Sequence, residues 1–373
     1  MFKLGVSFYS YQQSQFFKEL MLEDQIRELS RNLPGADGVE IIDEMSLRRY
    51  PDPGEAFIET WHGWMRDYGT VPVTMDVGMD VLQFRDHVMT HEECAERLRS
   101  DIRLAKRLGF RNVRVLSTAP MDVILRALPV AEELDIRIGR EVHQPMPLEG
   151  AQVTEIVDFV EKTGRSHLGI VPDFGIFQFR PSEVMLDWFV RRGARPEACE
   201  AAVDLALMLR DGNAPFTAID MSTETAGNIR SDLNQFLNSG DAKPSLRPAF
   251  EGVRAFTESR IANPNRIDHV VVAEALMMSG TSPDTLRQLV PHVVSVHGKF
   301  NNMSLVEGTT DQFHELSIDY AGAIGALRDG GYEGYVNTEY EGQRYFQDRD
   351  RAHLENEVEQ VRRHQSMLRR LAA

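Results

Sequence analysis

Cysteine is scarce in this chain of 373 residues, which has only Cys94 and Cys199, far apart in the sequence. So few cysteines exclude a disulfide scaffold and favour a reducing compartment, so we expect a cytoplasmic protein. Long apolar runs are also missing, because no stretch of about 18 residues is apolar throughout, and we expect no membrane-spanning helix. The first residues, MFKLGVSFYSY, have the pattern of a strand and lack the apolar region and cleavage site of a signal peptide.

Positive charge is in short supply as well. The chain has 41 Lys and Arg against 57 Asp and Glu, which gives a formal net charge of −16. A surface this acidic repels phosphate backbones and anionic lipids, so nucleic acid and membranes are not expected partners. For the same reason phosphorylated substrates are not favoured. The sequence also lacks the GxGxxG, GxxxxGKS and GxSxG motifs, so nucleotide-binding and serine-hydrolase interpretations have no support.

What the chain does have is an alternation of short apolar runs with longer helical stretches, the rhythm of βα units. Helical patterning falls between the runs, for example over His91–Leu108, which Gly109 ends. Eight strands, each feeding a helix, predict an α/β fold of the (β/α)8 TIM-barrel type. The predicted strands are Leu4–Tyr9, Gly38–Ile42, Val71–Val77, Asn112–Ser117, Ile136–His143, Leu168–Phe174, His292–Phe300 and Tyr335–Gly342.

One interval breaks this rhythm, since Asp173 and His297 stand 124 positions apart. The extra residues carry helical patterning at 184–190, 198–211 and 248–262. We therefore predict a barrel over residues 1–350, interrupted after strand six by a helical insertion at about 180–285, and a C-terminal helix over 351–373. A βα insertion lies over the catalytic face of a barrel, where it forms a lid or a pocket wall. The alternative is a helical hairpin that only covers the barrel surface.

Polar residues stand at or near the carboxyl ends of the last four predicted strands: Glu141, Asp173, His297 and Glu339. A barrel brings these ends together around one axis. Three carboxylates beside an imidazole would repel one another unless a cation lay between them. Oxygen and nitrogen ligands of this kind suit Mn²⁺, Mg²⁺, Co²⁺ or Zn²⁺. Any one of these side chains could instead bond to loop backbone, but the four together favour a metal site.

Two further residues belong to the same strand ends. His143 follows Glu141 by two positions, so both point to the same side of a strand, and an imidazole can move a proton at neutral pH. Lys299 follows His297 by two positions, and its ammonium can steady a developing enolate. The alternatives are a His143 that only bonds loop backbone and a Lys299 that is solvated or paired with Glu341.

Aromatic residues follow strands one and six, and we expect Tyr9, Phe174 and Phe177 to wall a sugar or aryl pocket, although such residues are more often core. Arg344 is a further expected substrate-binding residue. Supporting or substrate-contacting roles are also considered for Asp43, Asp76 and His314.

The order Glu, Asp, His, Glu on the last four strands, with EYEG at 339–342, resembles the xylose-isomerase-like sugar isomerase/epimerase superfamily of TIM barrels. The resemblance covers roughly residues 1–180 and 285–350. It implies that Glu141, Asp173, His297 and Glu339 bind a divalent metal. With the Glu-x-His pair and the long insertion, the chain is similar in particular to C-glycoside deglycosidase α subunits. That similarity implies a 3-oxo-C-glycoside substrate, a divalent metal, foremost Mn²⁺ with Mg²⁺ or Co²⁺ as alternatives, and a small β subunit in a hetero-oligomer.

Four functions follow as hypotheses. In a lyase, His143 removes a proton beside the keto group and the aromatic carbon then leaves. A keto-sugar isomerase or 3-epimerase shares the first half and returns the proton to the sugar. An endonuclease for damaged DNA would need more histidine ligands and a basic face, and the net charge of −16 argues against it. A metal-free binding scaffold would not need the four strand-end ligands.

Overall fold

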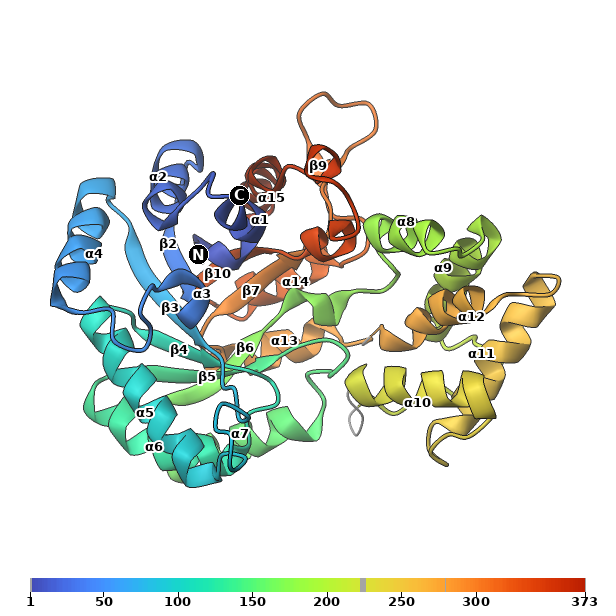
Figure 1. The fold of residues 1–373 in the computed structure, drawn as a ribbon, viewed down its shortest axis with the longest axis horizontal. Helices are drawn as coiled ribbons and strands as arrows, with labels where there is room; N and C mark the ends of the chain where they lie inside the picture. Colours follow the sequence, from blue (N-terminus) through green and yellow to red (C-terminus); the bar gives the residue numbers. More distant parts are fainter. Residues whose placement is uncertain (1, 222–225, 279, 373) are drawn as a thin grey trace.

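The barrel consists of eight parallel strands, and the computed structural model describes residues 2–221, 226–278 and 280–372. In Figure 1 the strands lie at the centre of the larger body, with helices around them. They are hydrogen-bonded in the order β6-β5-β4-β3-β2-β1-β10-β7, so the TIM-barrel prediction is confirmed. The strands are β1 Lys3–Ser7, β2 Ala36–Ile42, β3 Val71–Val77, β4 Asn112–Val115, β5 Arg137–Val142, β6 Leu168–Pro172, β7 Val296–Phe300 and β10 Tyr335–Tyr340.

The barrel closes between β6 and β7 by a seam instead of a regular ladder. Two isolated parallel bridges join the strands there, Ile170 with Val293 and Asp173 with His297. A short hairpin, β8 Ser304–Leu305 with β9 Phe313–His314, lies outside the barrel sheet. The seam therefore runs directly beside two of the predicted metal ligands.

Helices follow the strands as the sequence pattern predicts. α5, for example, begins at Thr90, whose hydroxyl accepts from the Glu93 N–H while the Glu93 carboxylate accepts from the Thr90 N–H, and it ends at Gly109 with a φ of 84°. The helices packed around the barrel are α2 Leu22–Asn32, α4 Glu55–Tyr68, α5 His91–Leu108, α6 Met121–Glu133, α7 Ala151–Thr163, α13 Pro283–Leu289, α14 Tyr320–Asp329 and α15 Glu357–Ala372, besides the short α1 Gln12–Phe16 and α3 Asp43–Ser46.

Several strand boundaries differ from the sequence-based expectation by one or two residues, and the start of β7 differs by four. The first strand ends at Ser7, because Phe8–Tyr11 forms a 3₁₀ turn that buries Phe8 and Tyr11. The seventh begins at Val296 and not at His292, because Val290–His292 is also a 3₁₀ turn, and Pro291 within it has no N–H to donate to a ladder.

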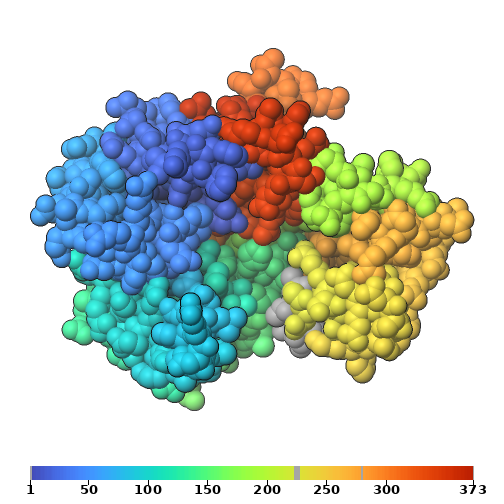
Figure 2. Space-filling view, viewed as in Figure 1, coloured from blue at the N-terminus to red at the C-terminus, as the bar shows by residue number. Residues whose placement is uncertain are grey.

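Between β6 and β7 five helices form a second body beside the barrel (Figure 1). They pack around their own hydrophobic core, which includes Phe189, Leu205, Phe236, Phe250 and Val271. Figure 2 shows the molecular surface hollowed between this insertion and the barrel. The helices are α8 Glu183–Arg191, α9 Pro196–Arg210, α10 Ala226–Ser239, α11 Arg247–Arg260 and α12 Arg266–Ala273.

Both cysteines, Cys94 and Cys199, are buried free thiols. Within the described ranges, no helix has the combination of length and apolar character that spanning a membrane requires.

The C-terminal helix α15 is fastened to the barrel through the fully buried His364. Its Nδ1 accepts from the Thr338 hydroxyl at 2.9 Å, and its Nε2 donates to the Tyr320 hydroxyl at 2.6 Å. Tyr320 in turn donates to the Lys299 carbonyl at 2.7 Å, and the imidazole stacks on Phe300 at 4.2 Å. These contacts use the neutral ring, and burial lowers the pKa of His364 to about 3.

This buried histidine makes stability fall as the solution becomes more acidic. Between the ordinary pKa of 6.5 and the folded pKa of about 3, the unfolded chain binds a proton at His364 that the folded chain does not. The stabilising contribution is therefore complete above pH 6.5 and is lost as the pH falls toward 3. We expect the difference in unfolding free energy between wild type and His364→Gln to shrink by about 2 kcal/mol from pH 7 to pH 5.

Urea unfolding at the two pH values measures this difference. His353→Gln, at an exposed position, is the matched control. A wild-type-to-variant difference that stays constant with pH would contradict the expectation.

Candidate functional site

The four predicted strand-end ligands lie together inside the carboxyl end of the barrel, and all are buried. The Nδ1 atom of His297 is 3.2 Å from Glu141 Oε1 and 3.3 Å from Glu339 Oε2. Asp173 joins them across the seam, and ligand atoms of Glu141, Asp173 and His297 lie within 4.8 Å of one another. The strands β5, β7 and β10 and the residue directly after β6 thus bring four distant positions to one place.

Local geometry explains why Asp173 faces this cluster. It precedes the 3₁₀ turn Phe174–Phe177, and its Oδ1 accepts from the Gly175 N–H at 2.6 Å. A side chain at Gly175 would place its Cβ only 2.8 Å from that oxygen, so glycine is the residue that allows the contact. The other oxygen, Oδ2, is left for the barrel interior.

The donor set fits a divalent metal. Around the cluster, in the described part of the chain, these buried atoms have no hydrogen-bond partner: Asp173 Oδ2, Glu339 Oε2 and both ring nitrogens of His297. Burying such atoms without a partner costs free energy, and like charges at this distance repel. Burial raises the pKa of Asp173 to about 6, against the opposing charge of Lys299. A cation bound by all four residues would remove both penalties.

A second group of charged residues, Glu40, Asp76 and Arg114, lies on the other side of His297. His297 Nε2 is 3.3 Å from Glu40 Oε1 and 3.8 Å from Asp76 Oδ2. Arg114 Nη2 is 3.4 Å both from Asp76 Oδ2 and from Glu141 Oε1. Glu40 and Arg114 were not predicted from the sequence, although a glutamate inside the apolar run GVEII was the available signal.

His143 and Lys299 are in direct contact beside the ligand cluster. His143 Nδ1 donates to the Gln144 carbonyl at 2.7 Å, so its Nε2 is the acceptor for Lys299 Nζ at 2.8 Å. Lys299 Nζ also lies 2.8 Å from Glu341 Oε2 and 3.7 Å from Asp173 Oδ2. Both contacts considered from the sequence as alternatives, His143 with backbone and Lys299 with Glu341, are therefore present. The lone pair of His143 Nε2 accepts from Lys299, so a substrate must displace this ammonium to reach it.

Glu341 forms ion pairs with two cations, because Arg344 Nη1 also lies 2.9 Å from its Oε2. Burial alone would raise the pKa of Glu341, but the charges of Lys299 and Arg344 lower it to about 2. The carboxylate is therefore ionised throughout the neutral range and fixes the position of Lys299.

We expect Glu341→Gln to destabilise the fold by about 3 kcal/mol, because it leaves the buried ammonium of Lys299 without its closest counter-charge. Urea unfolding measures the loss. The double variant Lys299→Met, Glu341→Leu is the control, since removing both charges should cost less than removing one. Equal or larger destabilisation in the double variant would contradict this account of the pair.

A cavity of about 610 Å³ opens above these residues, between the barrel and the insertion. That volume is in the range of small-molecule sites and exceeds what one sugar ring needs. Its barrel wall includes His143, Lys299, Glu341, Arg344 and Tyr345, and the opposite wall includes Met185, Arg230, Glu274, Met277 and Met278.

The predicted pocket aromatics take different positions. Phe174 is fully buried in the barrel core, with its ring edge-on to Tyr320 at 5.3 Å and to Phe177 at 5.7 Å, so it does not line the cavity. Tyr9 is half-buried, and burial together with the charge of Glu341 raises its pKa to about 12. The 3₁₀ turn after β6 directs Phe174 inward because its backbone no longer alternates as a strand does.

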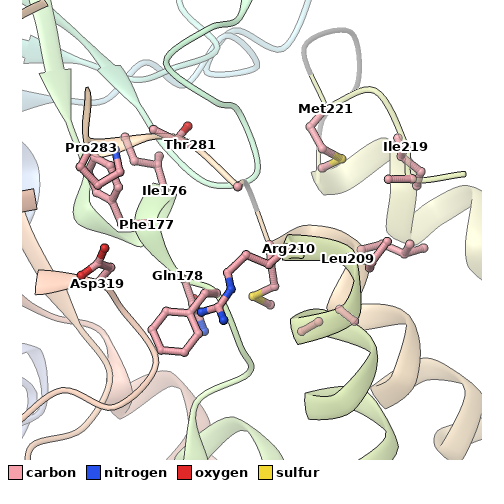
Figure 3. A pocket seen from close by; sticks show the side chains of 17 residues that line it. Ile176, Phe177, Gln178, Leu209, Arg210, Ile219, Met221, Thr281, Pro283 and Asp319 are labelled. Atoms are coloured by element: carbon pink, nitrogen blue, oxygen red, sulfur yellow. The ribbon is translucent and has the colours of Figure 1, made fainter. Parts of the chain in front are cut away.

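Phe177 lines a second cavity, of about 590 Å³, on the other side of Gln178. In Figure 3, Phe177 and Gln178 face this space from the barrel side, and Leu209 and Arg210 face it from α9. Gln178 also lines the first cavity, so it separates the two.

The remaining candidates lie away from the ligand cluster. Asp43 is buried at the start of α3, where its Oδ2 accepts from the Gly78 N–H at 2.9 Å. That bond ties the loops after β2 and β3 together. His314 belongs to the outer hairpin strand β9 and is half-buried there.

No family model matches the chain, but individual proteins are similar to it in sequence and in structure. It is 26% identical over 342 residues to a 3'-dehydrocarminate deglycosidase alpha subunit of Microbacterium sp., covering 91% of this chain and 88% of that protein. It is 27% identical over 342 residues to a C-glycoside deglycosidase alpha subunit of Arthrobacter globiformis, covering 91% and 83%.

Solved structures share the fold. An L-ribulose 3-epimerase matches with a TM-score of 0.51 and 13% identity, over 100% of this chain and 95% of that chain. The IOLI protein with a bound zinc atom matches with a TM-score of 0.53 and 12% identity, over 99% and 98%. The chain therefore shares the barrel fold of these two solved structures. Its sequence resembles enzymes named as deglycosidase alpha subunits, so the expected resemblance is confirmed.

Proposed function

We propose that this chain is a metal-dependent carbohydrate enzyme, the α subunit of a C-glycoside deglycosidase that cleaves the sugar–aglycone carbon–carbon bond of 3-oxo-C-glycosides. One observation carries the proposal: His143 and Lys299 line a cavity next to the ligand cluster, with Lys299 Nζ 3.7 Å from Asp173, and the far wall of that cavity has three methionines beside the Arg230–Glu274 ion pair. The names of the curated relatives support the same substrate class.

In this proposal Glu141, Asp173, His297 and Glu339 hold the divalent metal, which we propose to be Mn²⁺, with Mg²⁺ and Co²⁺ fitting the same ligands. When bound, the metal supplies a Lewis acid for the keto and neighbouring hydroxyl oxygens of the sugar. Arg114 offsets part of the buried negative charge, since it lies 3.4 Å from Glu141.

His143 acts as the general base. Its Nδ1–H is committed to the Gln144 carbonyl, so Nε2 is the nitrogen that takes the proton from the carbon between the keto group and the anomeric carbon. A substrate that reaches Nε2 displaces the Lys299 ammonium from its 2.8 Å contact. Lys299 stays tethered by Glu341 and can then donate to the oxygen on which negative charge develops.

The bond changes balance without an oxidant. The carbon–hydrogen bond beside the keto group and the anomeric carbon–aryl bond break, and a carbon–carbon double bond forms between the two sugar carbons. The aryl carbon gains the proton that the sugar lost. Met185, Met277 and Met278 on the insertion wall provide polarizable surface for the aromatic group.

We further propose a small β subunit as partner, in a hetero-oligomer, because the curated relatives are called alpha subunits. A cytoplasmic location is proposed from the two free cysteines.

A keto-sugar isomerase or 3-epimerase is the second candidate, favoured by the paired glutamates Glu141 and Glu339, both within 3.3 Å of His297 Nδ1. The deciding experiment expresses the chain alone and with the products of its neighbouring genes, and assays 3-oxo-C-glycosides beside free keto sugars. Release of the aglycone only with the partner supports the lyase. Turnover of free keto sugars by the chain alone would refute it, and purified protein free of divalent metal would refute both.

A further inference from the structure

The imidazole of His297 faces carboxylates on both of its nitrogens. Nδ1 lies 3.2 Å from Glu141 and 3.3 Å from Glu339, whereas Nε2 lies 3.3 Å from Glu40 and 3.8 Å from Asp76. A neutral imidazole carries one hydrogen, so only one nitrogen can bind a metal. Three-residue groups able to hold a cation occur on each side, with Glu40 and Asp76 or with Glu141 and Asp173.

We propose that Glu40 is a positioning residue, which accepts the Nε2–H of His297 and thereby leaves Nδ1 as the metal-binding nitrogen. This inference rests on the metal site of the proposed function and adds a residue that no part of that function assigned. A hydrogen bond from a metal-ligating histidine to a carboxylate fixes the ring and the nitrogen that carries the hydrogen.

The Glu40 carboxylate is held in place for this role. Its Oε2 accepts from Asn337 Nδ2 at 2.6 Å, and Asn337 Nδ2 is also 3.1 Å from Ser295 Oγ. The three side chains are fully buried. Asn337 Oδ1 lies against Gly5, where an added Cβ would be only 2.1 Å away, so glycine at this position leaves room for the amide. With Oε2 engaged, Oε1 is the oxygen nearest His297 Nε2, at 3.3 Å, and neither of these two buried atoms has a hydrogen-bond partner among the residues that the structure describes. The proposed hydrogen bond would satisfy both of them.

The number of carboxylates explains why the metal belongs on the Nδ1 side of the ring. Arg114 Nη2 lies 3.4 Å from both Asp76 Oδ2 and Glu141 Oε1, so this buried permanent cation is shared by the two sides. Lys299 lies 3.7 Å from Asp173 but is itself paired with Glu341 at 2.8 Å. Of the carboxylates that the structure describes, three lie on the Nδ1 side, those of Glu141, Asp173 and Glu339, whereas two lie on the Nε2 side, those of Glu40 and Asp76. A divalent ion at Nδ1 therefore relieves more like-charge repulsion than one at Nε2.

Glu40→Gln is the informative substitution because Asn337 would orient the new side-chain amide with its NH₂ group, and not its oxygen, toward His297. Asn337 Nδ2 keeps the amide oxygen of the new side chain, and the amide NH₂ then points at His297 Nε2. That NH₂ can only donate, so the ring hydrogen moves to Nδ1 and blocks the metal. We expect the dissociation constant for Mn²⁺ to rise about 10- to 100-fold.

Two measurements on the full chain test this. Free Mn²⁺ is followed by electron paramagnetic resonance during titration of wild type, Glu40→Gln, Glu40→Asp and the control Asp76→Asn. The control changes the other carboxyl beside Nε2 and should bind Mn²⁺ within about threefold of wild type, well short of the loss expected at a ligand-orienting residue. Histidine nitrogen-15 resonances of the zinc-loaded protein identify the ring nitrogen that is protonated. The His297 resonances are assigned as those that are absent from the spectrum of His297→Gln. Circular dichroism checks that each variant is folded.

The expected result is a protonated Nε2 in wild type, lost in Glu40→Gln together with Mn²⁺ affinity, and partly restored in Glu40→Asp. Wild-type affinity in a folded Glu40→Gln, or a wild-type spectrum with the hydrogen on Nδ1, would overturn the inference while leaving the metal-dependent function intact. A wild-type protein that binds no Mn²⁺ would overturn the proposed function itself.

Discussion

Replacing His143 by alanine is expected to lower turnover of a 3-oxo-C-glycoside by about 10²- to 10⁴-fold, the usual worth of a general base. The reason is geometric, because Nε2 of this ring is an acceptor directed at the site, with Nδ1–H committed to the Gln144 carbonyl. His143 is not among the four proposed ligands, so bound metal should remain at the wild-type level. Steady-state kinetics and metal analysis of the same preparation measure the two quantities.

The matched control for this variant is His167→Ala, at a position whose imidazole contacts the exposed Asp135 at 3.1 Å outside the barrel. It should keep wild-type turnover. Full activity of His143→Ala would assign proton abstraction to a different group, and loss of metal along with activity would make His143 a ligand.

Removal of the metal has the second large expected effect. Dialysis against a chelator should reduce turnover to background, and adding Mn²⁺ should restore it, because the keto oxygen loses its Lewis acid. The same addition should stabilise the fold by about 2.7 kcal/mol at a metal concentration 100 times the dissociation constant. The buried carboxylates make this stabilisation specific, since the ion neutralises Asp173, Glu141 and Glu339 where they repel one another.

Thermal unfolding with and without Mn²⁺ measures the effect on stability. Glu315→Gln changes a buried carboxyl in the loop before α14, which accepts from the Ser317 and Ile318 N–H groups, and this variant should keep the full metal-induced shift. A wild-type melting temperature that does not respond to Mn²⁺ would contradict the metal site.

The site residues that could be predicted from the sequence are the polar residues at the ends of apolar strands. Glu141, Asp173, His297 and Glu339 stand where apolar strands stop, and parallel strands in a barrel must bring such positions together. Strand spacing also placed His143 and Lys299 on the inner side, where the structure has them in contact at 2.8 Å.

The other features of the site depend on tertiary packing, which the pattern of apolar and polar residues does not reveal. Glu40 and Arg114 lie within strands, whereas the sequence-based prediction of the site rests on polar residues at strand ends. Phe174 is two positions beyond the end of β6, in a 3₁₀ turn, and the alternation of side chains along a strand does not predict which way a turn directs its residues. The far wall of the cavity comes from the insertion, and helical periodicity identifies such helices without indicating which residues face the barrel.

The position of the proposed metal at the seam between β6 and β7 has a consequence for the stability of the barrel. Asp173 and His297 form one of the two backbone bridges there, and both side chains are proposed ligands. The insertion leaves the barrel after β6 and returns before β7, so any force that the insertion exerts arrives at the same two strands. A bound cation would cross-link β6 and β7, the neighbouring strands that, among the described residues, share only two isolated bridges. The site where substrate is converted would then also be the site that stabilises closure of the barrel.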